Sequence, residues 1–209
     1  LGRATIEGLQ GTDLTSDCSV LACAKHLAAG GTPENGANFA PMDISERTLR
    51  ETYLEPFREA VDAGCRTFMA AHNEIDGVPC HGNPWLLRDV LRDELGFEGL
   101  LVSDFTDVIR LHSLHGVAAT PGAAYEMALE SGIDMHMHGP GFFDAILAAV
   151  EAGRIAEERI DEAAGRVLAL KFAAGLFPAD GEARSLETTP RPDTNLAVCF
   201  PDHDELALR

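Results

Sequence analysis

The sequence predicts an α/β fold built from about four β–α units in series. Four short apolar runs, residues 19–25, 66–72, 99–104 and 132–137, each suit a strand that is buried on both faces. Longer stretches with an apolar residue every three or four positions separate and follow these runs, as expected for helices. Strands that alternate with helices predict parallel pairing with right-handed crossovers.

The first predicted helix spans residues 45–63, where the apolar positions fall on one face. Asp43 and Glu46 have the spacing of a capping box at its start. Pro56 lies within this stretch, so we expect the helix to bend there or a second helix to begin.

A second helix is predicted over residues 84–95. Asn83 is suited to cap its amino end, and Gly96 follows the last apolar position, where a glycine commonly ends a helix. Three more helices complete the pattern, over residues 121–130, 142–152 and 156–174.

The end of the chain has a different composition. Residues 178–209 contain four prolines among acids and threonines and show no sustained apolar period, which predicts a linker. We therefore expect a domain over residues 1–177 and a Pro-rich linker that leads toward a second domain absent from this chain.

The charge of the chain argues against several kinds of partner. Its 34 acidic residues outnumber 16 Lys and Arg, for a net charge of −18, so we expect no nucleic-acid or anionic-membrane partner. The 5 cysteines include no C-x-x-C pair, and we expect small buried thiols. No signal peptide is visible, but the chain does not begin with Met, so the sequence leaves its compartment open between cytoplasm and export.

Polar side chains follow the predicted strands at their carboxyl ends. They are Lys25 with His26, His72 with Asn73, and Asp104. In parallel α/β folds these strand ends meet on one face and carry the chemistry. An ionised carboxylate near a lysine suits nucleophilic attack on the anomeric carbon of a sugar. The ordinary alternative for Asp104 is the cap of a helix.

Several motifs occur in a fixed order between residues 4 and 177, among them "ACAKHLAAGG", "FMAAHNEIDGVPCHGNPWLLRDVL", "GLLVSDF" and "GVAATPGAAYEMALESGIDMHM". Together they resemble the N-terminal (β/α)8 domain of glycoside hydrolase family 3, in its β-glucosidase branch. The resemblance implies an incomplete TIM-type (β/α) barrel of about four units, followed by a C-terminal helix and the linker. It also implies a retaining β-glycosidase that hydrolyses terminal β-D-glucosyl residues through a covalent glycosyl-Asp intermediate, without a cofactor.

The resemblance assigns roles to four residues. Asp104 matches the catalytic nucleophile, while Lys25 and His26 match the pair that hydrogen-bonds sugar hydroxyls. Met69 stands where the family has a residue that lines the same subsite, although a buried Met is also common as core filler. The implied substrate is a β-glucoside or a related oligosaccharide.

Two positions near Asp104 depart from the family pattern. Phe105 stands where many members have Trp, which forms an apolar platform for the leaving group. His72 stands where the family usually has Tyr, whose hydroxyl helps to position the nucleophile. A histidine donates a similar hydrogen bond only in the right tautomer.

The resemblance further implies parts that this chain lacks. Further strands lie upstream in the family, and the general acid/base of its β-glucosidase branch is a carboxylate from the following domain. Because general acid–base assistance is worth about 10²–10⁴ in rate, we expect little activity from this chain alone. Exposed barrel edges predict contact with the missing second domain or self-association.

Two other functions are compatible with the sequence. A metal-dependent TIM-barrel hydrolase is suggested by His136 and His138, two positions apart with Asp134 nearby, and His112 and His115 add to the histidines available. No motif supplies further ligands, so we predict no metal. A sugar-binding remnant without catalysis would retain the same polar residues as an enzyme.

Overall fold

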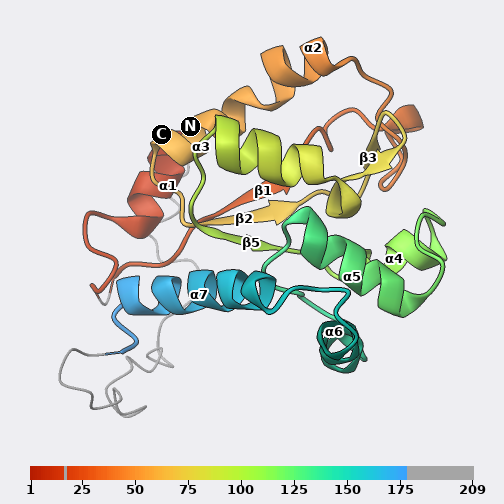
Figure 1. Cartoon of the computed structure of the whole chain (residues 1–209). Helices are drawn as coiled ribbons and strands as arrows, with labels where there is room; N and C mark the ends of the chain where they lie inside the picture. Colours follow the sequence, from red (N-terminus) through yellow and green to blue (C-terminus); the bar gives the residue numbers. More distant parts are fainter. Residues whose placement is uncertain (17, 178–209) are drawn as a thin grey trace, which may run out of the picture.

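A computed structural model gives the fold of residues 1–16 and 18–177. Figure 1 shows the central sheet near the middle of the molecule, with helices arranged around it. The predicted linker over residues 178–209, which includes Cys199, lies outside the described residues. No helix in the described part of the chain is both long and apolar enough to cross a membrane.

The central sheet is parallel and has the strand order β1-β2-β5. Its strands are β1 (Cys23–Leu27), β2 (Thr67–Ala70) and β5 (Leu100–Val102). Each lies within or overlaps one of the first three predicted apolar runs, so the prediction of an α/β fold with parallel strands is confirmed.

The fourth predicted strand, over residues 132–137, is reduced to one bridge between Val102 and Met135. The strand is interrupted because a side chain takes the place of a backbone hydrogen-bond partner. The Asp134 carboxylate accepts the Leu101 N–H at 3.0 Å, a donor that a regular parallel ladder would pair with a backbone carbonyl. The expectation of a regular strand here is wrong.

The predicted helix over residues 45–63 is divided into three pieces: α2 (Glu46–Thr48), the π-helical turn η2 (Leu49–Tyr53) and α3 (Glu55–Asp62). Pro56 lies in the first turn of α3, so the expected new start is confirmed. Ser45, not Asp43, caps the first piece, because its Oγ accepts the Thr48 N–H at 3.2 Å.

The second predicted helix is the π-helix η4 (Trp85–Glu94). Asn83 caps its amino end, because Asn83 Oδ1 accepts the Leu86 N–H at 3.0 Å. Two helices, α1 and α4, were not predicted: α1 precedes the first strand, and α4 is only two turns long. The remaining elements are α1 (Gly2–Gln10), η1 (Glu34–Gly36), β3 (Glu74–Ile75), β4 (Val78–Pro79), η3 (Cys80–Gly82), η4 (Trp85–Glu94), α4 (Asp107–Ser113), α5 (Pro121–Ser131), α6 (Phe142–Glu151) and α7 (Glu157–Ala173).

The two faces of the sheet differ in their packing. Phe68 and Leu101 are fully buried in the main hydrophobic cluster beneath the helices. Met69 and Val102, their neighbours in sequence, pair with each other in register and lie outside that cluster. Alternate strand residues point to opposite faces, so Met69 and Val102 face the other side of the sheet.

The cysteines divide into two groups. Cys65 and Cys80 are buried, as expected, and burial raises the pKa of the Cys80 thiol to about 12. Cys18 and Cys23 are exposed, so the expectation of buried thiols is wrong for these two. Cys23 begins β1, which is an edge strand of the described sheet and therefore lacks a neighbour on one side.

A buried ion-pair cluster fixes the segment after β5. Both oxygens of Asp134, whose side chain is 0% exposed, meet arginines: Arg92 at 2.7 Å, Arg166 at 2.8 Å and Arg159 at 3.2 Å. Burial lowers the pKa of Arg92 to about 10, even though Asp134 acts to raise it. This one carboxylate therefore joins η4 and α7 to the sheet.

The cluster predicts a large loss of stability for Asp134→Asn. The amide keeps the shape of the side chain but removes the carboxylate that pairs with Arg92 and leaves Arg159 and Arg166 with Glu162 alone, which should cost about 3 kcal/mol of unfolding free energy. Urea denaturation measures the change. Asp161→Asn is the matched control, because Asp161 is exposed on α7 and should change stability by less than about 0.5 kcal/mol. Equal losses in the two variants would contradict a structural role for the cluster.

Candidate active site

Asp104 follows β5 and lies at the carboxyl end of the parallel sheet. The residue is 8% exposed, and its Oδ1 accepts the adjacent Phe105 N–H at 2.6 Å. Helix α4 begins at Asp107 after Thr106, and no side chain caps it. Asp104 therefore does not serve as a helix cap, which was the ordinary alternative for an acid at this place.

Two histidines from the neighbouring strands meet the second carboxylate oxygen. Asp104 Oδ2 lies 3.0 Å from His72 Nε2 and 3.2 Å from His26 Nε2. In neither contact do the directions satisfy a hydrogen bond, so this buried oxygen has no hydrogen-bond partner among the described residues. The two imidazoles stack, with ring centroids 5.4 Å apart. The structure thus brings three predicted site residues together.

At His26, burial shifts the pKa of the imidazole more than the nearby Asp104 charge does. It lowers the pKa of the imidazole below its ordinary value, although the Asp104 charge acts in the opposite direction. Lys25, next in sequence, also acts to lower this pKa. His26 is therefore neutral near pH 7, and its Nε2 can present a lone pair.

A second carboxylate orients His72. Asp107 Oδ2 lies 2.5 Å from His72 Nδ1, and its Oδ1 accepts from Arg110 at 2.6 Å. A carboxylate paired with arginine accepts hydrogen bonds only, so His72 Nδ1 carries a proton, while Nε2 lies 3.0 Å from Asp104 Oδ2. The Arg110 guanidinium also lies over the Phe39 ring, 4.3 Å from its centroid. The tautomer that was open from sequence is fixed by this chain of contacts.

His81 supports the backbone of Asp104. The Asp104 N–H donates to His81 Nε2 at 2.9 Å, so that nitrogen must be unprotonated. Full burial lowers the pKa of His81 to about 4. The imidazole is 2% exposed and stays neutral under ordinary conditions.

The side chains of the other predicted site residues form no hydrogen bond or ion pair with the carboxylate. Lys25 is exposed, forms no ion pair or hydrogen bond with described residues, and lines a separate hollow of about 320 Å³ with Tyr53 and Phe57. Met69 is 8% exposed on the face of the sheet away from the main core. Phe105 is 55% exposed and stacks on His138, with ring centroids 4.4 Å apart.

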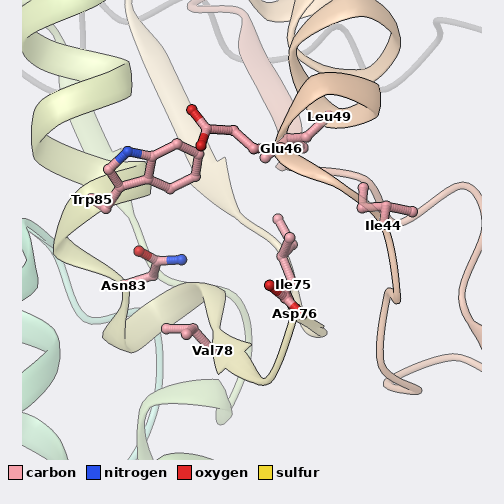
Figure 2. Close-up of a pocket in the computed structure, with 8 residues that line it drawn as sticks. All are labelled: Ile44, Glu46, Leu49, Ile75, Asp76, Val78, Asn83 and Trp85. Atoms are coloured by element: carbon pink, nitrogen blue, oxygen red, sulfur yellow. The ribbon is translucent and has the colours of Figure 1, made fainter.

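Two hollows near the strand ends differ in what lines them. A cavity of about 150 Å³ is bordered by His26 and His72 together with Phe39 and Asn73. A larger hollow of about 360 Å³ lies between α2, η4 and the β3–β4 hairpin, and Figure 2 shows the Trp85 ring at its edge. The larger one contains none of the predicted site residues.

The residues of the alternative metal site are not brought together as ligands. Asp134 is occupied by its three arginines, and His136 packs its ring against Tyr125 and Phe142. His138 stacks on Phe105 instead. Further along the chain, His112 contacts the Ala118 carbonyl and His115 contacts Glu74.

Asp107 and His81 were missed by sequence reasoning. Asp107 stands three positions after Asp104, and that spacing at the start of an unrecognised short helix was its only signal. His81 lies in η3, far from Asp104 in sequence, and reaches it only because that loop folds back over the strand end.

The comparisons with known proteins agree on one family. The model of the glycosyl hydrolase family 3 N terminal domain matches residues 1–170. A β-xylosidase of Formosa agariphila is 42% identical over 90% of this chain and 27% of its own length. A periplasmic β-glucosidase of Salmonella typhimurium is 35% identical over 85% of this chain and 23% of its own length. This chain therefore spans about a quarter of the length of these relatives.

Solved structures give the same answer for the fold. The β-glucosidase of Listeria innocua in complex with isofagomine superposes with a TM-score of 0.86, at 36% identity over 94% of this chain and 28% of that chain. The expected incomplete TIM-type (β/α) barrel is thereby confirmed. With its family model matched over most of its length, the chain belongs to the glycosyl hydrolase family 3 N terminal domain family.

Proposed function

We propose that this chain carries the nucleophile of a retaining β-glycosidase that hydrolyses terminal β-D-glucosyl residues. The observation that carries the proposal is the position of the Asp104 carboxylate, which lies between His26 and His72 at the carboxyl ends of three parallel strands. The membership of this chain in the glycosyl hydrolase family 3 N terminal domain family supports this reaction class. The β-glucosidase and β-xylosidase relatives support a β-linked pyranoside as substrate.

In the first step an Asp104 oxygen attacks the anomeric carbon. A carbon–oxygen bond to the enzyme forms, the bond to the leaving group breaks, and the departing oxygen takes a proton from a general acid. Water then attacks the same carbon and releases the sugar with its original configuration. We propose that Oδ2 is the attacking atom, because it accepts no hydrogen bond from the described residues that the reaction would have to break.

The general acid is expected outside the described residues. Asp107 is the carboxylate beside Asp104 in the site, but it is 2% exposed and held by His72 and Arg110. It is therefore not free to protonate a glycosidic oxygen. We propose that a domain beyond the linker over residues 178–209 supplies the acid/base.

The remaining residues form the sugar site in this proposal. Lys25 and His26 hydrogen-bond sugar hydroxyls, Met69 lines the subsite, and Phe105 forms an apolar platform for the leaving group. The exposed Phe105 ring and the exposed Lys25 side chain are both available for such contacts. His72 positions the nucleophile and takes the place of the family tyrosine, with Asp107 holding its ring.

A sugar-binding role without chemistry is the second candidate. It is favoured by one observation, namely that Asp104 does not border the 150 Å³ cavity that His26 and His72 line. The two candidates differ in one testable property, the reactivity of the Asp104 carboxylate.

Covalent labelling distinguishes the candidates. Incubation with a 2-fluoro glucosyl fluoride should add one fluorosugar to Asp104, because fluoride departs without a proton donor and the 2-fluoro group slows release of the sugar. Mass spectrometry of the digested chain locates the adduct. Asp104→Asn should abolish labelling, while Asp93→Asn, at an exposed position on η4, should leave it intact. Sugar binding without any adduct would favour the second candidate.

The buried His81 predicts a pH dependence of stability. The folded pKa of about 4 lies below the ordinary value of 6.5, so the unfolded chain takes up this proton first as pH falls. The unfolding free energy therefore keeps the full contribution of this histidine above pH 6.5. It falls by up to about 3 kcal/mol as the pH falls from 6.5 toward 4. Urea denaturation across this range measures the slope.

His81→Gln should flatten that slope, because the glutamine oxygen still accepts the Asp104 N–H but does not titrate. His138→Gln is the matched control, since His138 is exposed and should leave the slope as it is in the parent chain. An unchanged slope in His81→Gln would show that the buried imidazole does not control stability in this range.

A further inference from the structure

We propose that His26, His72 and Asp104 form a binding site for one divalent transition-metal ion, with Zn²⁺ as the best match, and that the bound ion blocks the carboxylate. The two Nε2 atoms and Asp104 Oδ2 all lie within 4.8 Å of one another. This inference goes beyond the proposed glycosidase reaction, which uses no metal. It concerns a ligand that would compete with that reaction.

The distances fit a small tetrahedral ion. Bonds of about 2.0–2.2 Å from zinc to nitrogen and oxygen place neighbouring ligand atoms about 3.3 Å apart. The observed separations from Oδ2 are 3.0 Å to His72 and 3.2 Å to His26. The two histidine nitrogens lie no more than 4.8 Å apart, and side-chain rotations that bring them to about 3.3 Å would complete three corners of a tetrahedron. The fourth corner would be open to water, since His26 and His72 border the 150 Å³ cavity.

The protonation of the donors also suits a metal. His72 Nδ1 donates to Asp107, so Nε2 is the nitrogen left to bind an ion. A carboxylate behind a histidine ligand is the usual arrangement at metal sites and raises the basicity of that ligand.

The strongest single observation is the unsatisfied oxygen. Asp104 Oδ2 is buried without a hydrogen bond, and leaving a buried polar atom unpaired costs free energy. If both imidazoles present lone pairs to it, the three atoms repel one another. A cation between them would convert that repulsion into three attractive contacts.

The ligand set selects the class of ion. Two imidazoles and one carboxylate suit Zn²⁺ and its transition-metal neighbours, whereas Mg²⁺ and Ca²⁺ prefer oxygen ligands throughout. The positive charge of Lys25 acts against any cation, but this side chain is exposed, so solvent screens it. The consequence for function follows from Oδ2, because an oxygen bound to a metal cannot attack a sugar.

Binding can be measured without any assay of activity. The exposed Cys18 and Cys23, together with Cys199, are first replaced by serine, so that thiolates do not compete for the ion. Equilibrium dialysis of the full chain against Zn²⁺ should give one ion per chain, and Co²⁺ should show the absorption of a tetrahedral complex. Prior fluorosugar labelling of Asp104 should prevent binding of either ion.

Substitutions identify the ligands. His26→Gln and His72→Gln should each weaken Zn²⁺ binding at least about ten-fold, while the control His138→Gln should leave it unchanged. Asp107→Asn should weaken it about 10–100-fold without touching the ion, because it removes the group behind a ligand. Circular dichroism checks that each variant is folded. The absence of a stoichiometric ion in the chain with these three cysteines replaced would overturn the proposal, as would equal affinities for His26→Gln, His72→Gln and His138→Gln.

Discussion

Parallel pairing of β1, β2 and β5 is the constraint on which the site depends. Because parallel strands end at the same edge of a sheet, residues far apart in sequence are brought to one place. His26 lies next to the last residue of β1, His72 follows β2, and Asp104 follows β5. Their close approach is a consequence of strand order, and the buried Asp134 cluster holds the last of these strands against η4 and α7.

The electrostatics of the site follow from where each group is buried. A carboxylate that faces two imidazoles would ordinarily raise their pKa values, yet burial outweighs this effect at His26. At His81, burial lowers the pKa to about 4, and the neutral imidazole accepts the backbone N–H of Asp104. The Asp107 carboxylate pairs with the Arg110 guanidinium and orients the His72 ring through its contact with Nδ1. Asp104 Oδ2 is left buried without a hydrogen bond from the described residues, and the two proposals give this oxygen its roles, as the atom that attacks the sugar and as a metal ligand.

Much of this arrangement could be predicted from the sequence. Apolar runs and caps gave the parallel α/β pattern, and motifs in order gave the family. Strand-end polar residues gave Asp104, His26 and His72 as neighbours, because that inference needs only strand direction. The reduction of the predicted fourth strand to a single bridge could not be foreseen, since it depends on an Asp134 side chain that takes the place of a backbone carbonyl. Asp107 and His81 could not be predicted either, because their contacts arise from a short helix and a folded loop that leave little periodic signal. The exposure of Lys25 likewise depends on tertiary contacts.

The central claim is that the Asp104 carboxylate is the group that bonds to the sugar. A crystal structure of the chain after reaction with a fluorosugar would test it most directly. The account predicts continuous density from Asp104 Oδ2 to the anomeric carbon, with the sugar ring beside His26 and His72. A sugar joined to another side chain, or held without a bond while the Asp104 carboxylate points away from it, would contradict the account.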